Sequence, residues 1–207
     1  MRGRYSGLRI GFDLDNTLIS YDGLFFEAAV RSKFIPSDFQ GTKRDIRDRI
    51  RLLPDGEIEW QRLQADVYGH GVVRAVPASG ALQFAKLARA GGADLAIVSH
   101  KSIFANIGSA DVNLRDAARE WLRNSGFLGP DAIPEENLFF EGTRAEKIAR
   151  IIALRCTHFV DDLEEVFNDP AFPQGVERML ISAVRTVPAG PYRAYSSFDE
   201  IADAFAD

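Results

Sequence analysis

Two aspartates that lie two residues apart, Asp13 and Asp15, are the side chains of this sequence best suited to chemistry. They belong to the stretch Asp13-Leu-Asp-Asn-Thr17, which directly follows a short apolar run. Residues two apart in a strand point to the same side, so both carboxylates can face one crevice where the strand ends. Neighbouring carboxylates repel each other and are costly to desolvate, and a divalent cation or a shared proton offsets that cost. The pattern therefore favours a reactive site over a strand end that merely becomes polar.

Three further groups of polar side chains occur later in the chain. Ser99 ends an apolar run and offers a hydroxyl donor, and Asp161 and Asp162 together end another. Lys147 lies near the start of a predicted helix, where a positive charge opposes the helix dipole. Each has an ordinary explanation when taken singly, as a polar strand end, a helix N-cap or a solvated helix residue. Their joint occurrence at the carboxyl ends of strands favours a site, because open α/β sheets hold their ligands at that edge.

Short strands and helices that alternate along the chain must position these side chains. Five short apolar runs bounded by polar residues are typical of strands buried on both faces: 8–15, 94–99, 137–141, 157–161 and 178–182. Helical patterns lie between and after them: 81–90, 114–126, a helix from Thr143 and a helix from Ser197. The last two begin with capping boxes, closed by Glu146 and Glu200. The alternation predicts an α/β fold with a doubly wound, Rossmann-like parallel sheet.

The segment 21–71 breaks the alternation and has the pattern of three helices. Its expected apolar stripes are Phe26, Val30 and Phe34, then Ile46, Ile50 and Leu53, then Trp60, Leu63 and Val67. Turn signals at Pro36 and at 54–56 separate the helices. We therefore expect residues 1–20 and 72–207 to form the α/β core domain, and residues 21–71 to form a small all-helical cap inserted after the first core strand.

The order of the motifs, Asp-x-Asp-x-Thr, Ser, Lys and Asp-Asp, resembles that of the haloacid dehalogenase-like (HAD) superfamily. The resemblance implies a Mg²⁺-dependent phosphatase in which Asp13 attacks phosphorus and forms an aspartyl-phosphate. It implies that Asp15 is the general acid/base. It further implies that Thr17 and Ser99 bind phosphate oxygens, and that Lys147 neutralises the nucleophile and the phosphoryl group.

The same resemblance implies a metal site built from Asp13, Asp15, Asp162 and Asp161. Matching Phe-Val-Asp161-Asp162 to the Gly-Asp form of the family places Asp162 on the family's aspartate, so we expect Asp162 as the direct ligand and Asp161 in either shell. Mg²⁺ prefers hard oxygen ligands and keeps several waters, so two or three carboxylates are enough. One departure is mild: Asn16 stands where many members have glycine, and other members carry asparagine there.

Selectivity is expected to lie outside the four motifs, because these recognise only phosphate. Trp60, Gln64 and Tyr68 are spaced by four residues on one predicted helix face. They either pack within the cap, with Gln64 solvated, or face the core and hydrogen-bond a hydroxyl-rich leaving group such as a sugar. The basic stretch 43–47 is an alternative contact for a second anionic group. His100 is a further candidate for reading the substrate or for simple packing.

Four other functions use related residues. A dehalogenase attacks carbon and needs neither a metal nor the second aspartate, so Asp15 and the pair Asp161-Asp162 argue against it. A phosphomutase shares all four motifs and stays open; dependence on a bisphosphate activator would reveal it. A phosphoacceptor signalling domain also joins acids, a hydroxyl residue and a lysine, but its acceptor aspartate lies on a later strand. A catalytically silent scaffold is disfavoured because every catalytic position is filled.

Composition limits the partners that we expect. The chain has 207 residues and a net charge of −5, which gives no electrostatic footprint for nucleic acid. No apolar run approaches the roughly 20 residues that cross a bilayer. Cys156 is the only cysteine, which excludes an intrachain disulfide and suits a cytoplasmic protein. We expect a small phosphorylated molecule as substrate and neither nucleic acid nor membrane as partner; the substrate's identity and the oligomeric state stay open.

Overall fold

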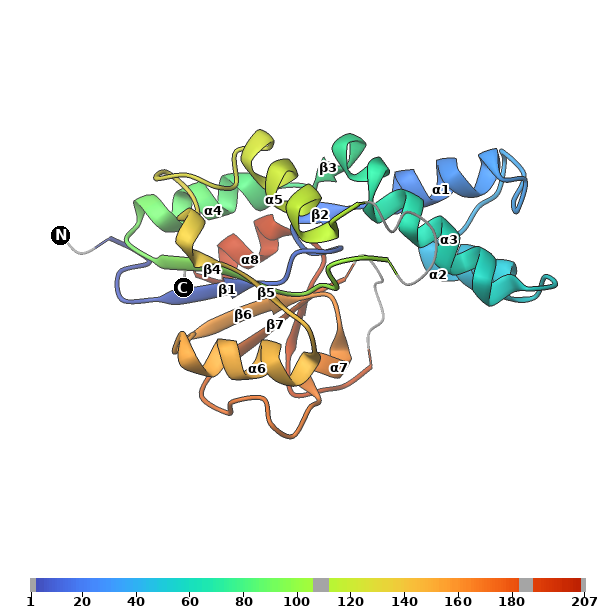
Figure 1. Ribbon diagram of the computed structural model, residues 1–207. Coiled ribbons are helices and arrows are strands. Elements are labelled where there is room, and N and C mark those ends of the chain that lie inside the picture. The colour runs from blue at the N-terminus through green and yellow to red at the C-terminus, as the bar shows by residue number, and fades with distance from the viewer. Residues whose placement is uncertain (1–2, 106–111, 183–187, 206–207) are drawn as a thin grey trace. The chain divides into compact units, whose positions relative to one another are not determined.

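The computed structural model describes residues 3–105, 112–182 and 188–205 (Figure 1). The chain forms two compact units. The first, here called the core unit, comprises Met1–Ile19, Pro77–Lys101 and Leu122–Asp207. The second, here called the insertion unit, comprises Ser20–Val76 and Ser102–Trp121. The predicted cap segment 21–71 falls within the insertion unit, which also takes in a later part of the chain.

A six-stranded sheet forms the centre of the core unit, and its neighbouring strands pair in parallel. The strands are β1 (Arg9–Phe12), β4 (Asp94–His100), β5 (Leu138–Glu141), β6 (His158–Asp161), β7 (Glu177–Ile181) and β8 (Arg193–Tyr195). Their order is β5-β4-β1-β6-β7-β8, which places β1 between β4 and β6. This confirms the predicted α/β fold with a parallel sheet. The edge strand β8 was not predicted, because it is short and mostly exposed and lacks an apolar run.

Helices cover both faces of this sheet (Figure 1). On one face α4 (Ala81–Ala90) lies against α8 (Phe198–Ala204), and on the other lie α6 (Arg144–Ala153) and α7 (Glu164–Phe167). The 3₁₀ turn η2 (Glu135–Asn137) precedes β5, and α5 (Leu114–Asn124) crosses the sequence boundary between the two units. Layers on both faces bury the sheet, which explains why the interiors of its central strands are mainly apolar.

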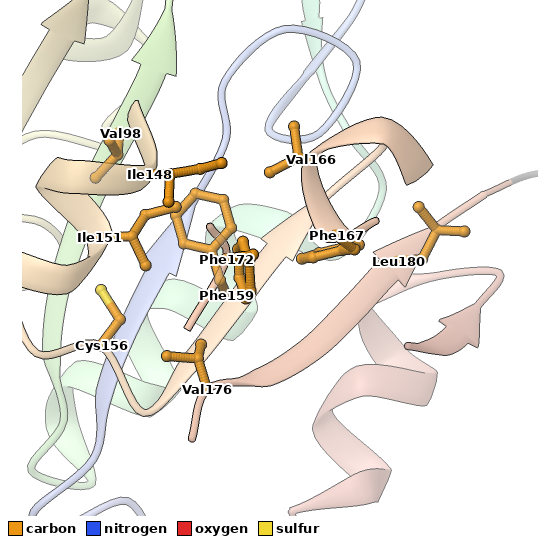
Figure 2. Close-up of a cluster of buried hydrophobic side chains, with 10 residues drawn as sticks. All are labelled: Val98, Ile148, Ile151, Cys156, Phe159, Val166, Phe167, Phe172, Val176 and Leu180. Carbon is orange, nitrogen blue, oxygen red and sulfur yellow. The ribbon is translucent and has the colours of Figure 1, made fainter. Parts of the chain in front are cut away.

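A buried apolar cluster holds α6 and α7 against the sheet (Figure 2). Its members are Val98, Ile148, Ile151, Cys156, Phe159, Val166, Phe167, Phe172, Val176 and Leu180. Ile148 and Ile151 therefore have the predicted core role, whereas the prediction for Ile152 was wrong, because its side chain is 51% exposed. Successive helix residues are about 100° apart, so a face centred on Ile148 and Ile151 turns Ile152 toward solvent. Cys156 serves as a small apolar residue, and burial raises the pKa of its thiol to about 11.

The start of α6 is set by its N-cap. The Oγ1 of Thr143 accepts from the backbone N–H of Glu146 at 3.1 Å, as the capping pattern predicts. The Glu146 carboxylate accepts from the N–H of Gly142, one residue before the position that a standard box would use. The cap fixes where the first turn begins and so places Lys147 on the buried side of the helix.

Three helices build the insertion unit: α1 (Asp22–Arg31), α2 (Lys43–Arg51) and α3 (Gly56–Tyr68). The short strands β2 (Ile19–Ser20) and β3 (Val76–Pro77) pair where the chain leaves and rejoins the core unit, and the 3₁₀ turn η1 (His70–Arg74) precedes β3. The predicted stripe on α1 was wrong by one position. The residues buried on α1 are Leu24, Phe25, Ala28 and Ala29. The rotation follows from the Phe25 ring, which stacks on Trp60 with centroids 5.1 Å apart.

The two remaining stripes in the insertion unit are buried as predicted, except for one residue. Ile46 and Ile50 on α2 are buried, and so are Trp60, Leu63 and Val67 on α3. Leu53 is 40% exposed because it lies beyond the end of α2. In the described parts of the chain, no helix combines the length and the apolarity needed to span a membrane.

Candidate active site

Asp13 lies directly after the central strand β1 and continues its pairing with β6. Its backbone N–H donates to the carbonyl of Val160 at 2.8 Å, so its position is fixed by the sheet. Its side chain is almost wholly buried. The Nζ of Lys147 donates to Oδ1 of Asp13 and to Oδ2 of Asp161, each at 2.7 Å. The first, third and fourth predicted motifs thus meet at one point at the carboxyl edge of the sheet.

Burial dominates the electrostatics of this cluster. It raises the pKa of the Asp13 carboxyl to about 7; Lys147 lowers that pKa, while the charges on Asp161 and Asp15 raise it. Burial alone would lower the pKa of Lys147, but Asp13 and Asp161 raise it above its ordinary value, so the ammonium stays charged. One buried lysine does not offset the crowded carboxylates, and the cluster has the charge that attracts a cation.

Three carboxylates could share that cation. Oxygens of Asp13, Asp161 and Asp162 lie within 4.8 Å of one another, and they form the group of potential metal ligands found among the described residues. Asp161 is fully buried, and its Oδ1 accepts from the N–H of Leu163 at 3.0 Å while its Oδ2 accepts from Lys147. Asp162 is only half-buried. An all-oxygen donor set of this kind fits Mg²⁺.

Asp15 does not belong to that group of oxygens and has a different partner. The Nζ of Lys101 donates to both carboxylate oxygens of Asp15, at 2.9 and 2.7 Å. Lys101 is 5% exposed and was assigned no role from the sequence. The sequence did contain a signal for this contact. Lys101 follows Ser99 by two residues, as Asp15 follows Asp13, and the two pairs lie at the ends of adjacent parallel strands.

Two hydroxyl groups near these acids are buried without a partner. The Oγ1 of Thr17 and the Oγ of Ser99 have no hydrogen bond to any part of the chain that the structure describes. A buried hydroxyl left unpaired costs free energy, so a ligand that offers acceptor oxygens would be favoured here. Thr17 follows a tight turn in which its N–H donates to the carbonyl of Leu14. Asn16 has a φ of 61° in this turn, a left-handed conformation that glycine and asparagine tolerate, which accounts for the residue at this position.

The residues predicted to read the substrate have mixed surroundings. Trp60 packs in the interior of the insertion unit, stacked on Phe25. The hydroxyl of Tyr68 accepts from the Nζ of Lys43 at 2.8 Å, and this ammonium also lies 4.5 Å from the centroid of the Phe25 ring. Gln64 is half-buried. Trp60 therefore contributes to packing, whereas Gln64 and Tyr68 are accessible in part.

His100, at the end of β4, makes a contact that holds the neighbouring loop. Its side chain is exposed, and its Nε2 lies 3.0 Å from the carbonyl oxygen of Gly142, just before α6. A ring N–H at Nε2 would donate to that carbonyl. The contact links the loop after β5 to the end of β4 and supports the start of the helix that carries Lys147.

Solved structures with a similar arrangement of the chain identify the fold. A haloacid dehalogenase-like family hydrolase from Streptococcus pneumoniae matches with a TM-score of 0.59 and 13% identity, over 95% of this chain and 98% of that one. A HAD hydrolase from Bacillus subtilis, bound to magnesium, matches with a TM-score of 0.59 and 13% identity, over 98% and 100%. The chain has the haloacid dehalogenase-like fold.

A third structure with this HAD-like fold contains phosphate. It is a HAD family hydrolase from Deinococcus radiodurans with bound phosphate and sodium, and it matches with a TM-score of 0.57 and 15% identity, over 96% of this chain and 94% of that one. No family model and no curated protein matches the sequence. The predicted resemblance is thus confirmed as a HAD-like fold, and the activity has to be argued from the side chains at the carboxyl edge of the sheet.

Proposed function

We propose that the protein is a Mg²⁺-dependent phosphatase that hydrolyses a small phosphorylated metabolite through an aspartyl-phosphate at Asp13. One observation carries the proposal. The same edge of the sheet holds the buried Asp13 carboxylate, which Lys147 binds, and two buried hydroxyls without hydrogen-bond partners, those of Thr17 and Ser99. A nucleophile, a cation and hydroxyl donors are the parts that phosphoryl transfer needs. Bound magnesium and bound phosphate in two structures of the same fold lend further support.

Asp13 is the proposed nucleophile of the first step. One of its carboxylate oxygens forms a bond to phosphorus while the bond from phosphorus to the ester oxygen breaks. The departing oxygen takes a proton from the carboxyl of Asp15. Water then attacks phosphorus, its proton passes to Asp15, and the acyl phosphate bond breaks to release inorganic phosphate and the free Asp13 carboxylate.

The remaining side chains would bind and neutralise the phosphoryl group. The hydroxyls of Thr17 and Ser99 would donate to its oxygens, which would satisfy both buried groups. Lys147 holds the nucleophile through its ammonium and would offset the charge that develops on the phosphoryl oxygens. Asp13 and Asp162 would hold the metal, with Asp161 close by; when bound, Mg²⁺ supplies a positive charge that neutralises phosphoryl oxygens.

We include in this proposal a role for the insertion unit in choosing the substrate. The hydroxyls and carboxylates described above recognise phosphate alone, so the leaving group has to be recognised by other side chains. Gln64 and Tyr68 are the polar, partly accessible members of the predicted stripe on α3. Segments that close over a reacting phosphate commonly supply such contacts in enzymes.

Release of phosphate from a generic aryl phosphate, with and without Mg²⁺, tests the proposal. The wild-type protein should release phosphate only with Mg²⁺, and Asp13→Asn should abolish release because an amide cannot attack phosphorus. Asp131→Asn, at an exposed position of the core unit, is the matched control and should be fully active. Near-wild-type activity in Asp13→Asn would contradict the covalent mechanism. Turnover that requires a bisphosphate activator would indicate a phosphomutase, and no turnover of any phosphorylated sugar, nucleotide or acid would indicate a scaffold.

A further inference from the structure

The core unit buries a second lysine that the mechanism above does not use. Lys101 lies just beyond β4, and its side chain is 4% exposed. Its ammonium contacts both oxygens of the Asp15 carboxylate, at 2.9 and 2.7 Å. Removing an ammonium from water is costly unless a well-aligned anion compensates it, so a buried contact of this geometry marks a specific pairing. The pair joins positions that are 86 residues apart in the sequence.

The backbone of Lys101 is anchored to the neighbouring strand. Its backbone N–H donates to the carbonyl of Glu141 at 3.0 Å, which extends the pairing of β4 with β5 past the end of the strand. Asp15 follows β1, where its backbone forms a β-bridge with Ile19, and its side chain is 22% exposed. A contact from an anchored ammonium to both oxygens restrains rotation of the carboxylate. The ammonium of Lys101 therefore sets the orientation of the Asp15 carboxylate.

Orientation matters for the role that the proposed function gives to Asp15. A proton passes efficiently only when donor and acceptor atoms are within hydrogen-bond reach and aligned. A carboxyl group that rotates freely in a turn would meet that condition for a small part of the time. Lys101 also offsets the charge of Asp15, as Lys147 offsets the charges of Asp13 and Asp161. Asp15 and the neighbouring acidic group therefore each have a buried cation of their own.

We propose that Lys101 is a positioning residue for the general acid/base, and that it acts by fixing the orientation of the Asp15 carboxyl at the edge of the phosphate site. This inference rests on the proposed phosphatase function. Lys101 should affect the two steps in which Asp15 transfers a proton, the departure of a poor leaving group and the activation of water. It does not matter for the attack of Asp13 on a substrate whose leaving group departs without a proton.

Lys101→Met tests this inference with two substrates, an alkyl phosphate and dinitrophenyl phosphate. For the alkyl phosphate we expect kcat/KM to fall by about 10-fold to 100-fold, part of what a general acid contributes. For dinitrophenyl phosphate we expect kcat/KM to be unchanged within about threefold, because the first irreversible step needs no proton, while kcat falls because water activation is slowed. Lys101→Arg keeps a cation and should restore part of both losses.

Two controls separate this outcome from a general loss of structure. Lys86→Met makes the same change at an exposed lysine on α4 and should leave both substrates unaffected. The rise in thermal midpoint that Mg²⁺ causes should persist in Lys101→Met; where that variant does not fold, Lys101→Gln, which retains a donor of similar length, replaces it. Equal losses on both substrates, or no loss on either, would overturn the positioning role. A wild-type protein that hydrolyses neither substrate with Mg²⁺ would instead refute the phosphatase proposal and remove the positioning role with it.

Discussion

Replacing Asp13 with asparagine should stabilise the metal-free protein, and the gain should grow as the pH rises. The carboxyl titrates near 3.8 in an unfolded chain, and burial raises the pKa of Asp13 to about 7 in the folded protein. Between these values the folded state binds the proton and the unfolded state does not, so stability falls as the pH rises through this window. Asparagine has nearly the shape of the protonated acid and no charge to lose, so it removes this penalty.

The difference of about three pKa units sets the size of the effect. Each unit corresponds to about 1.4 kcal/mol, so the free energy of unfolding should rise by about 4 kcal/mol at most in Asp13→Asn near pH 8. Near pH 5 only about one unit separates the solution pH from the unfolded pKa, and the gain should shrink to about 2 kcal/mol or less. The attraction of Lys147 already lowers the pKa of Asp13 and is included in these values. The readout is the difference between the stability gain at pH 8 and the stability gain at pH 5.

Urea unfolding in the presence of a chelator, at both pH values, measures these gains. Asp131→Asn, which makes the same change at an exposed aspartate, serves as the control. Saturating Mg²⁺ should reverse the order at pH 8, because the ion stabilises the wild-type protein more than the variant that lacks one ligand charge. A variant that is less stable than the wild type at pH 8 without metal would refute the reasoning. It would show that the attraction between Lys147 and Asp13 outweighs the cost of burying the carboxylate.

Four more outcomes are expected. Thr17→Val removes a buried, unpartnered hydroxyl, so urea unfolding should show a gain of about 1 kcal/mol while competitive inhibition by inorganic phosphate weakens; loss of stability would mean that the hydroxyl has a partner. Asp15→Ala should slow hydrolysis by about 10²-fold to 10⁴-fold and let mass spectrometry detect phosphoenzyme formed from an activated substrate; full hydrolysis would contradict its role as general acid/base. Asp162→Ala should remove the rise in thermal midpoint caused by Mg²⁺, and a full rise in that variant would move the direct ligand role to Asp161. Gln64→Ala should lower kcat/KM for the true substrate but not for a small aryl phosphate, and equal effects on both would exclude substrate reading by α3.

Local sequence patterns determined most of the elements in the core unit. Apolar runs of five to eight residues predicted five of its six strands, because a strand buried on both faces has to be mainly apolar. The helix from Ala81 to Ala90 was predicted with the bounds that α4 has, since its apolar periodicity ends at two glycines. The cap at Thr143 was readable because it depends on residues only three or four positions apart.

The acidic cluster was predictable for a related reason. Parallel strands bring their carboxyl ends to one edge of a sheet, so polar groups that end successive strands have to lie near one another. Asp13, Ser99 and Asp161 each lie at or next to the carboxyl end of such a strand, and Lys147 lies in the first turn of the helix after β5. Their order along the chain was therefore enough to predict that they converge.

Tertiary packing alone decided the features that depend on exact distances and on the rotation of helices. The position of Ile152 at the surface and the burial of Phe25 follow from how each helix is turned against its neighbours. The pairing of Lys101 with Asp15 depends on two loop conformations after adjacent strands, and a lysine after a strand most often reaches solvent. The two side chains are 86 positions apart in the sequence. They meet because of the register of β1 against β4 and because the packing leaves room for the contact. Neither condition can be inferred from the residues that neighbour Lys101 or Asp15 in the sequence.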